Sequence, residues 1–143
     1  MSKVRLSTHL REPLVRLLPV FSADSRVMAV FVFGSQTDGY ATEQSDIDLA
    51  VLFDRPLSLM EEAGLLDNLC HVSGLDNLDL VNLNKSSLII QYRAISGQLL
   101  YERDADRVSD FIEYVTLRYL DFKPMLCEFE RQYDLAMEAA YGV

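Results

Sequence analysis

The sequence predicts an α+β fold in which a small β-sheet is flanked by helices and followed by a C-terminal helical segment. Two short and mostly apolar runs, Val27–Phe33 and Ile47–Phe53, have the composition of buried strands. Ser58 stands three residues before Glu61 at the head of an apolar segment, which is the pattern of a helix N-terminus. Residues 104–140 place apolar side chains at helical spacing.

The chain is 143 residues long and half hydrophobic, which is enough for one folded domain. We expect a single domain over residues 1–143, with a core at about 27–103 and a helical segment at about 104–140. No apolar run approaches the roughly 18 residues of a membrane span, and the N-terminus lacks a signal peptide's apolar stretch. We therefore expect a cytoplasmic protein without membrane contact. Cys70 and Cys127 are too few for a disulfide framework and are expected to be reduced.

The net charge of −9 is concentrated in the middle of the chain. Residues 27–80 contain ten acidic side chains and a single basic one, Arg55. A surface of this charge repels the phosphates of nucleic acids, so direct nucleic-acid binding is not expected. The same surface attracts metal cations and, through them, a metal-bound nucleotide.

The first half of the chain is predicted to contain a helix, two strands and a second helix. Apolar residues at helical spacing predict a helix over Ser7–Phe21. The strands Val27–Phe33 and Ile47–Phe53 follow, and Pro56 ends the second. The helix that Ser58 caps is expected to run to about Val72, where Ser73 and Gly74 stop it.

The second half is predicted to contain two further strands and two helices. Asn77–Leu83 is expected to be a third strand, with Leu78 and Leu80 on one face and Asp79 and Val81 on the other. Ser86 or Ser87 caps a helix that runs through Ala94 and ends at Gly97, and Gln98–Tyr101 forms a short strand. Asp104 caps the long C-terminal segment, which Pro124 should kink or divide near Asp121.

Two aspartates at the start of the second strand predict a metal site. Because side chains alternate along a strand, Asp46 and Asp48 face the same way, roughly 6.5 Å apart. Aspartate is depleted in strands, so two on one face of a core strand require an explanation. A Mg²⁺ site would explain them, because Mg²⁺ binds one or two carboxylates together with substrate phosphates.

Two further elements extend this site. Asp79 lies in the middle of the third strand between apolar residues, where an unpaired charge would be costly, and is the candidate third carboxylate. Asp76 is the alternative, and a salt-bridged aspartate on an edge strand is the competing interpretation of Asp79. Gly34 permits a tight turn, after which backbone amides and the Ser35 hydroxyl can bind a phosphate.

The motif over residues 34–48, Gly-Ser followed after ten residues by Asp-Ile-Asp, resembles the signature of the DNA polymerase β-like nucleotidyltransferase superfamily. The short chain, with DLVNL at 79–83 and LLYERD at 99–104, narrows the resemblance to the minimal nucleotidyltransferase (MNT) branch. More narrowly, the chain resembles the antitoxin partner of HEPN-family ribonuclease toxins. The looser similarity extends from about Val27 to Tyr119.

The resemblance implies a polymerase β-like fold with a small mixed sheet, and a specific chemistry. Two Mg²⁺ ions, about 4 Å apart, would be held by Asp46, Asp48 and Asp79, while Gly34 and Ser35 bind the phosphates of ATP. In this family the third carboxylate can also accept the proton of the attacking hydroxyl. The implied reaction transfers AMP to a tyrosine of the HEPN toxin and blocks its ribonuclease site.

One departure from the family keeps other functions open. Active relatives commonly carry one or two arginines after Gly-Ser, whereas this chain has Gln36-Thr37-Asp38. A catalytically weak antitoxin that masks its partner by binding is therefore a second hypothesis, and transfer to a small molecule is a third. Because Arg55 is the single cation in residues 27–80, metal ions and backbone amides would neutralise most of a triphosphate. Lys85 and Arg93 are candidates to help, but a solvated helix surface is the favoured interpretation of both.

The aromatic residues of the C-terminal segment allow two interpretations. They either pack over the core or form a face that docks a partner. The residues concerned are Phe111, Tyr114, Tyr119, Phe122, Phe129, Tyr133 and Tyr141.

Overall fold

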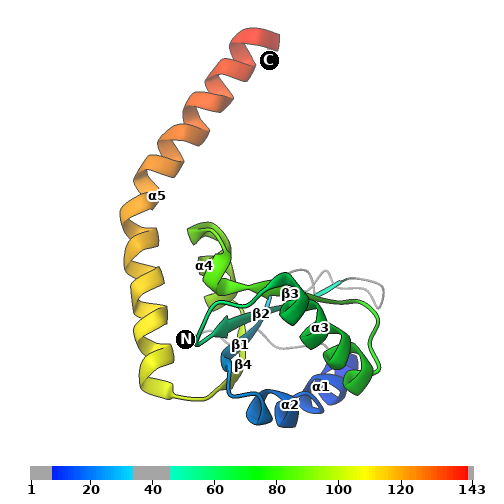
Figure 1. Ribbon diagram of the computed structural model, residues 1–143. Coiled ribbons are helices and arrows are strands. Elements are labelled where there is room, and N and C mark those ends of the chain that lie inside the picture. Colours follow the sequence, from blue (N-terminus) through cyan, green and yellow to red (C-terminus); the bar gives the residue numbers. More distant parts are fainter. Residues whose placement is uncertain (1–7, 34–45, 142–143) are drawn as a thin grey trace.

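The structure, a computed structural model, describes residues 8–33 and 46–141 and consists of a four-stranded β-sheet with helices on both faces (Figure 1). Among the described residues no helix is long and apolar enough to cross a lipid bilayer. The elements are, in chain order, α1 (Thr8–Val15), α2 (Leu18–Ala23), β1 (Val27–Phe33), β2 (Ile47–Phe53), α3 (Leu59–Ser73), β3 (Leu78–Asn82), the short 3₁₀ helix η2 (Leu83–Lys85), α4 (Leu88–Ile95), β4 (Gln98–Glu102) and α5 (Ala105–Tyr141).

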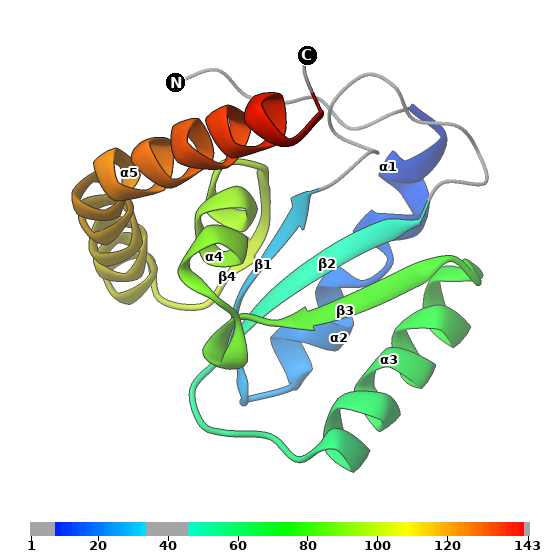
Figure 2. The same cartoon turned by 90° about the horizontal axis from the view of Figure 1, so that it is seen from above.

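The sheet is mixed, with strand order β3-β2-β1-β4 (Figure 2). The central strand β1 pairs antiparallel with both β2 and β4. β2 pairs with β3 in parallel, and α3 supplies the crossover that a parallel pair requires. The α+β class and the small mixed sheet predicted above are confirmed.

The sheet separates two hydrophobic clusters. One face, which carries Val30, Val32 and Leu49, packs against α1, α2 and α3. The other face, which carries Phe31 and Ala50, packs against α4 and the first half of α5. Figure 1 shows α1 and α2 below the sheet and α4 above it. All seven residues of β1 are buried, as expected of a central strand covered on both faces.

The N-terminal helix differs from the prediction. A single helix over Ser7–Phe21 was expected, but the structure has two helices, with α2 starting at Leu18. Pro19 lies in the first turn of α2, where a residue without a backbone N–H is tolerated. Proline disfavours the continuation of an earlier helix, and here the chain starts a new one.

The predicted boundaries of α3 are confirmed. The Ser58 hydroxyl accepts a hydrogen bond from the Glu61 amide, and the Glu61 carboxylate accepts one from the Ser58 amide. At the other end Gly74 adopts a left-handed conformation with a φ of 76°, which residues with a Cβ resist.

The third strand is shorter than the predicted Asn77–Leu83, because it begins at Leu78 and ends at Asn82. The Asn82 side chain accepts a hydrogen bond from the Asn84 amide at 2.9 Å and caps η2. The predicted alternation is confirmed: Leu78 and Leu80 contribute to the cluster beside α3, whereas Val81 contributes to the cluster beside α4.

The C-terminal segment is one helix, α5, and Pro124 does not divide it. The Asp104 carboxylate caps it by accepting hydrogen bonds from the Asp106 and Arg107 amides, as predicted. Figure 1 shows that the helix changes direction part-way along, and Pro124 is the proline inside it. Its first half lies against α4, and its second half extends away from the rest of the molecule.

Candidate active site

The parallel pairing of β2 and β3 brings two of the predicted catalytic aspartates together. Asp48 on β2 and Asp79 on β3 are register partners, so they lie side by side on neighbouring strands. Asp46 lies two residues before Asp48, directly ahead of β2. Asp48 and Asp79 therefore lie at the end of the sheet where β2 and β3 both begin, and Asp46 is next to them along the chain.

Asp48 and Asp79 belong to the same face of the sheet. Asp48 alternates with Leu49 and shares its face with Ala50, while Asp79 shares its face with Val81. Ala50 and Val81 both pack in the cluster that α4 and α5 cover. The aspartates consequently lie at the open end of this covered face.

The electrostatics of the site centre on Asp48, which is half-buried. Burial raises the pKa of Asp48 above its ordinary value, and the negative charges of Asp79 and Asp46 raise it further. The positive charge of Arg93 on α4 opposes this effect and lowers the pKa. The site thus holds an excess of negative charge, which a bound cation would neutralise.

One premise behind the choice of Asp79 was wrong. The sequence suggested a charge enclosed between apolar neighbours, but Asp79 is exposed. The reason is that β3 forms an edge of the sheet. Among the described residues Asp79 forms no ion pair, which argues against the competing interpretation of a salt-bridged aspartate.

The structure distinguishes Asp79 from the alternative third carboxylate, Asp76. Asp76 precedes β3, and its charge acts on the thiol of Cys70, whose pKa is raised mainly by burial. Asp79, in contrast, acts on Asp48. Of these two aspartates, Asp79 is therefore the one that lies beside Asp48. Cys70 and Cys127 are both free cysteines, as expected.

The two cations considered for a triphosphate differ in their surroundings. The Lys85 ammonium donates a hydrogen bond to a Glu62 carboxylate oxygen at 3.1 Å, so its charge is already paired. Arg93 is exposed on α4, on the side of the sheet that carries the aspartates. Arg93 is therefore the better placed of the two.

The predicted phosphate-binding residues Gly34 and Ser35 lie outside the described residues, as does Gln36-Thr37-Asp38. The strand β1, which precedes these residues in the sequence, ends at the site, because Phe33 at its end is the register partner of Asp48. Sequence reasoning did not anticipate this neighbour, since the pairing of two strands is not visible in either strand alone.

The donor set fits a hard divalent cation, because carboxylate oxygens are the ligands that Mg²⁺ prefers. Within residues 8–33 and 46–141 no three acidic, histidine or cysteine side chains converge closely enough to form a ready cation cage. Metal binding by Asp46, Asp48 and Asp79 therefore remains a proposal.

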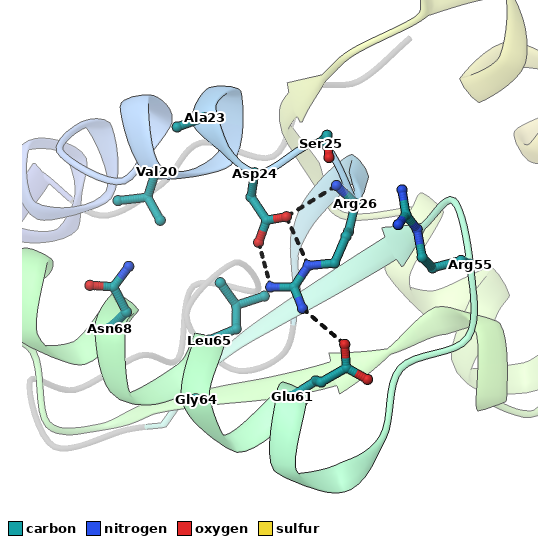
Figure 3. Close-up of a pocket in the computed structure, with 10 residues that line it drawn as sticks. All are labelled: Val20, Ala23, Asp24, Ser25, Arg26, Arg55, Glu61, Gly64, Leu65 and Asn68. Carbon is teal, nitrogen blue, oxygen red and sulfur yellow. Dashed lines mark hydrogen bonds and ion pairs between the residues drawn. The ribbon is translucent and has the colours of Figure 1, made fainter.

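A separate pocket of about 700 Å³ lies at the other end of the strands, where β1 begins and β2 ends (Figure 3). It contains none of the predicted site residues. In Figure 3 the Arg26 guanidinium lies between two carboxylates, with distances of 2.8 Å to Asp24 and 3.3 Å to Glu61. Because Arg26 is already paired, this pocket is a poor candidate for a phosphate group.

Comparison with known proteins assigns the family. Residues 16–106 match the family described as "Polymerase beta, Nucleotidyltransferase". Protein adenylyltransferase MntA of Aphanizomenon flos-aquae is 30% identical to this chain over 132 residues, covering 85% of each protein. The chain belongs to the minimal nucleotidyltransferases of the polymerase β family.

Solved structures of other proteins share this fold. A chain of a toxin–antitoxin structure with AMP-PNP superimposes with a TM-score of 0.64 at 24% identity, covering 88% of this chain and 97% of that one. A second match is to a complex of tri-AMPylated Shewanella oneidensis HEPN toxin with MNT antitoxin, with a TM-score of 0.59 and 23% identity. That match covers 88% of this chain and 94% of the other. At these identities the two structures support the fold.

Proposed function

We propose that this minimal nucleotidyltransferase is an antitoxin that transfers AMP from ATP to a tyrosine hydroxyl of a cognate HEPN ribonuclease toxin. The observation that carries the proposal is the register pairing of Asp48 with Asp79, with the charge of Asp46 also acting on Asp48. The similarity to a protein adenylyltransferase at 30% identity supports the reaction class. The likeness to a complex of a tri-AMPylated HEPN toxin with its MNT antitoxin suggests the acceptor.

The transfer is an in-line displacement at the α-phosphate of ATP. The tyrosine oxygen forms a bond to the α-phosphorus, the bond from that phosphorus to the bridging oxygen breaks, and pyrophosphate leaves. Asp79, which is exposed and adjacent to Asp48, accepts the hydroxyl proton and passes it to solvent. Holding the two substrates in line supplies much of the rate acceleration.

In this proposal Asp46, Asp48 and Asp79 hold two Mg²⁺ ions, which, when bound, neutralise phosphate charge and orient the α-phosphate. The excess negative charge around Asp48 supports this assignment. Gly34 and Ser35 would bind the outer phosphates, and Arg93 would add a positive charge from α4. Because Arg55 is the single basic residue of 27–80, backbone amides and metal ions must neutralise most of the negative charge of the triphosphate.

The test is the intact mass of the protein encoded beside this chain, measured after incubation with the chain, ATP and Mg²⁺. A gain of one or more adenylates that is absent with Asp46→Ala would support protein AMPylation by this site. Full activity in Asp46→Ala, with an unchanged circular dichroism spectrum, would contradict the metal-site assignment.

A second candidate function is neutralisation by binding without transfer. It is favoured by Gln36-Thr37-Asp38, which replaces arginines with an acidic residue where phosphates would bind. A stable complex that inhibits the ribonuclease without ATP, and shows no mass gain, would establish this function instead. If neither a complex nor a mass gain were found, transfer of a nucleotide to a small molecule would be the remaining hypothesis.

A further inference from the structure

One face of α5 is apolar along nearly its whole length, but only its first part is covered. Apolar side chains recur every three or four residues, which places them on one side of a helix. In the first half, Val108 and Val115 are fully buried on this face. In the second half, Phe129 and Tyr133 on the same face are 68% and 57% exposed.

We call the second part of this face the distal stripe. It consists of Phe122, Met125, Leu126, Phe129, Tyr133 and Met137. The opposite side of the same helical segment is mainly charged, with Glu128, Arg131 and Asp134 all exposed. This division is the amphipathic pattern of a helix that packs against another surface.

Most of the distal stripe is uncovered among the described residues: Phe122 and Leu126 are half-buried, whereas the other four side chains are exposed. Figure 1 shows this half of α5 extending past α4 and away from the sheet. Contiguous apolar surface of this kind on a folded protein is typical of an interaction site. A long helix that leaves the body of its own domain gains little stability by itself, because helices in proteins are stabilised mainly by packing an apolar face.

The stripe begins at a small hollow beside α4. Leu88 at the start of α4 and Phe122 and Met125 of α5 line a pocket of about 270 Å³, together with Arg118 and Asp121. The hollow joins the surface of α4 to the exposed half of α5. It can therefore receive an apolar side chain from a molecule that lies along the stripe.

Charge argues against a second copy of this chain as the occupant. Residues 119–141 carry five acidic and two basic side chains, a net charge of −3. One of the two basic residues, Arg131, is already paired with Glu128 at 2.7 Å. Two copies would oppose segments of the same sign, whereas a basic partner would be complementary. A ribonuclease has such a basic surface, because it binds RNA phosphates.

The position of the stripe also matches a protein acceptor. α4 and α5 cover the face of the sheet on which Asp48 and Asp79 lie. The distal half of α5 therefore projects on the same side as the candidate active site (Figure 1). A protein held along the stripe and over α4 would lie on the side from which its hydroxyl must reach the aspartates.

We propose that the distal stripe of α5 is the surface on which the HEPN toxin docks. The proposal rests on the proposed function, since it names the docking surface for the same protein acceptor. The acidic face of the helix would contact basic residues at the rim, and the toxin would bury Phe129 and Tyr133 at the centre.

The test compares two charge-introducing variants of the full chain by isothermal titration calorimetry against the protein encoded beside it. Phe129→Asp alters the stripe. Leu135→Asp alters an exposed apolar residue on the other side of the same helix, which is 48% exposed. Phe129→Asp should weaken binding about tenfold or more, as for a central aromatic of an interface, while Leu135→Asp leaves the affinity unchanged. Circular dichroism checks that both variants keep their helix content, and Phe129→Leu should restore most of the affinity.

The outcomes separate this inference from the proposed function. If the wild-type chain binds and both aspartate variants bind equally well, the docking surface is wrong while the antitoxin function stands. If the wild-type chain neither binds nor modifies the protein, the proposed function itself fails. If light scattering shows a dimer of this chain that Phe129→Asp dissociates, the stripe covers a second copy, which overturns the assignment to the toxin.

Discussion

Asp48 of β2 and Asp79 of β3 occupy paired positions in a parallel strand pair, although 30 residues separate them in the sequence. The pairing has an energetic consequence, because each carboxylate lies in the electrostatic field of the other. Burial and this neighbouring charge raise the pKa of Asp48. Negative charge on Asp48 is therefore unfavourable when no cation is bound, and a bound cation would relieve this cost.

The first prediction distinguishes the two candidates for the third carboxylate. Asp79→Asn should lower the rate of adenylate transfer by about hundredfold or more, because in the proposed mechanism Asp79 is both a metal ligand and the proton acceptor. Asp76→Asn should retain nearly the wild-type rate, since Asp76 acts on Cys70 and not on Asp48. The measurement is the initial rate at saturating ATP. A large loss in Asp76→Asn with normal activity in Asp79→Asn would reverse the assignment.

The second prediction concerns the stability of the metal-free protein. The pKa of Asp48 is higher in the folded state than in the unfolded chain. Ionising Asp48 at a pH above the ordinary aspartate pKa therefore lowers the free energy of unfolding. This cost develops as the pH rises from the ordinary aspartate pKa through the raised one, and it is fully present above both. Asp48→Asn should therefore increase the free energy of unfolding at pH 7, and the gain should shrink as the pH falls to about 4.

Urea unfolding in EDTA at the two pH values measures this effect. Asp106→Asn, an exposed residue at the start of α5, is the control and should show no comparable gain. Added Mg²⁺ should stabilise the wild-type chain and not Asp48→Asn. Equal unfolding midpoints for wild type and Asp48→Asn at pH 7 would refute the electrostatic account.

The third prediction uses two glycines with opposite surroundings. A Cβ at Gly97 would lie 2.3 Å from the Val32 carbonyl oxygen, so Gly97→Ala should destabilise the protein by about 1–3 kcal/mol. Gly64 lies inside α3, where a Cβ would meet no atom within 4 Å, so Gly64→Ala should stabilise it by about 0.5–1 kcal/mol. Thermal unfolding of the two variants should show shifts of opposite sign. Destabilisation by both would indicate that α3 is not a helix at this position.

The fourth prediction concerns Arg103, whose guanidinium joins the end of β4 to the turn before β1. It donates hydrogen bonds to the carbonyl oxygens of Phe21, Asp24 and Val27 at 3.0, 2.9 and 2.9 Å. Arg103→Lys keeps the charge but loses the planar set of donors, so it should cost about 1–3 kcal/mol. The control is Arg107→Lys, on an exposed residue. Identical denaturation midpoints for the two variants would show that the guanidinium geometry is unimportant.

Much of the local structure could be predicted from residues close together in the sequence. The boundaries of β1 and β2 follow from their apolar runs, and Ser58, Gly74 and Asp104 mark helix ends by local hydrogen bonding or backbone conformation. The pairing of Asp46 with Asp48 on one face needs only the alternation of side chains along a strand. The break at Pro19 was missed because the apolar spacing continues through it.

The set of elements and the acidic motif can therefore be predicted from the sequence, because both depend on interactions among near neighbours. Tertiary packing, in contrast, makes Asp79 the partner of Asp48, since strand order and register arise from contacts between distant segments. It also decided that Asp79 is exposed on an edge strand and that α5 leaves Phe129 and Tyr133 uncovered. The apolar spacing along α5 is the same in both halves, and only the extent of the domain beneath the helix determines where its burial stops.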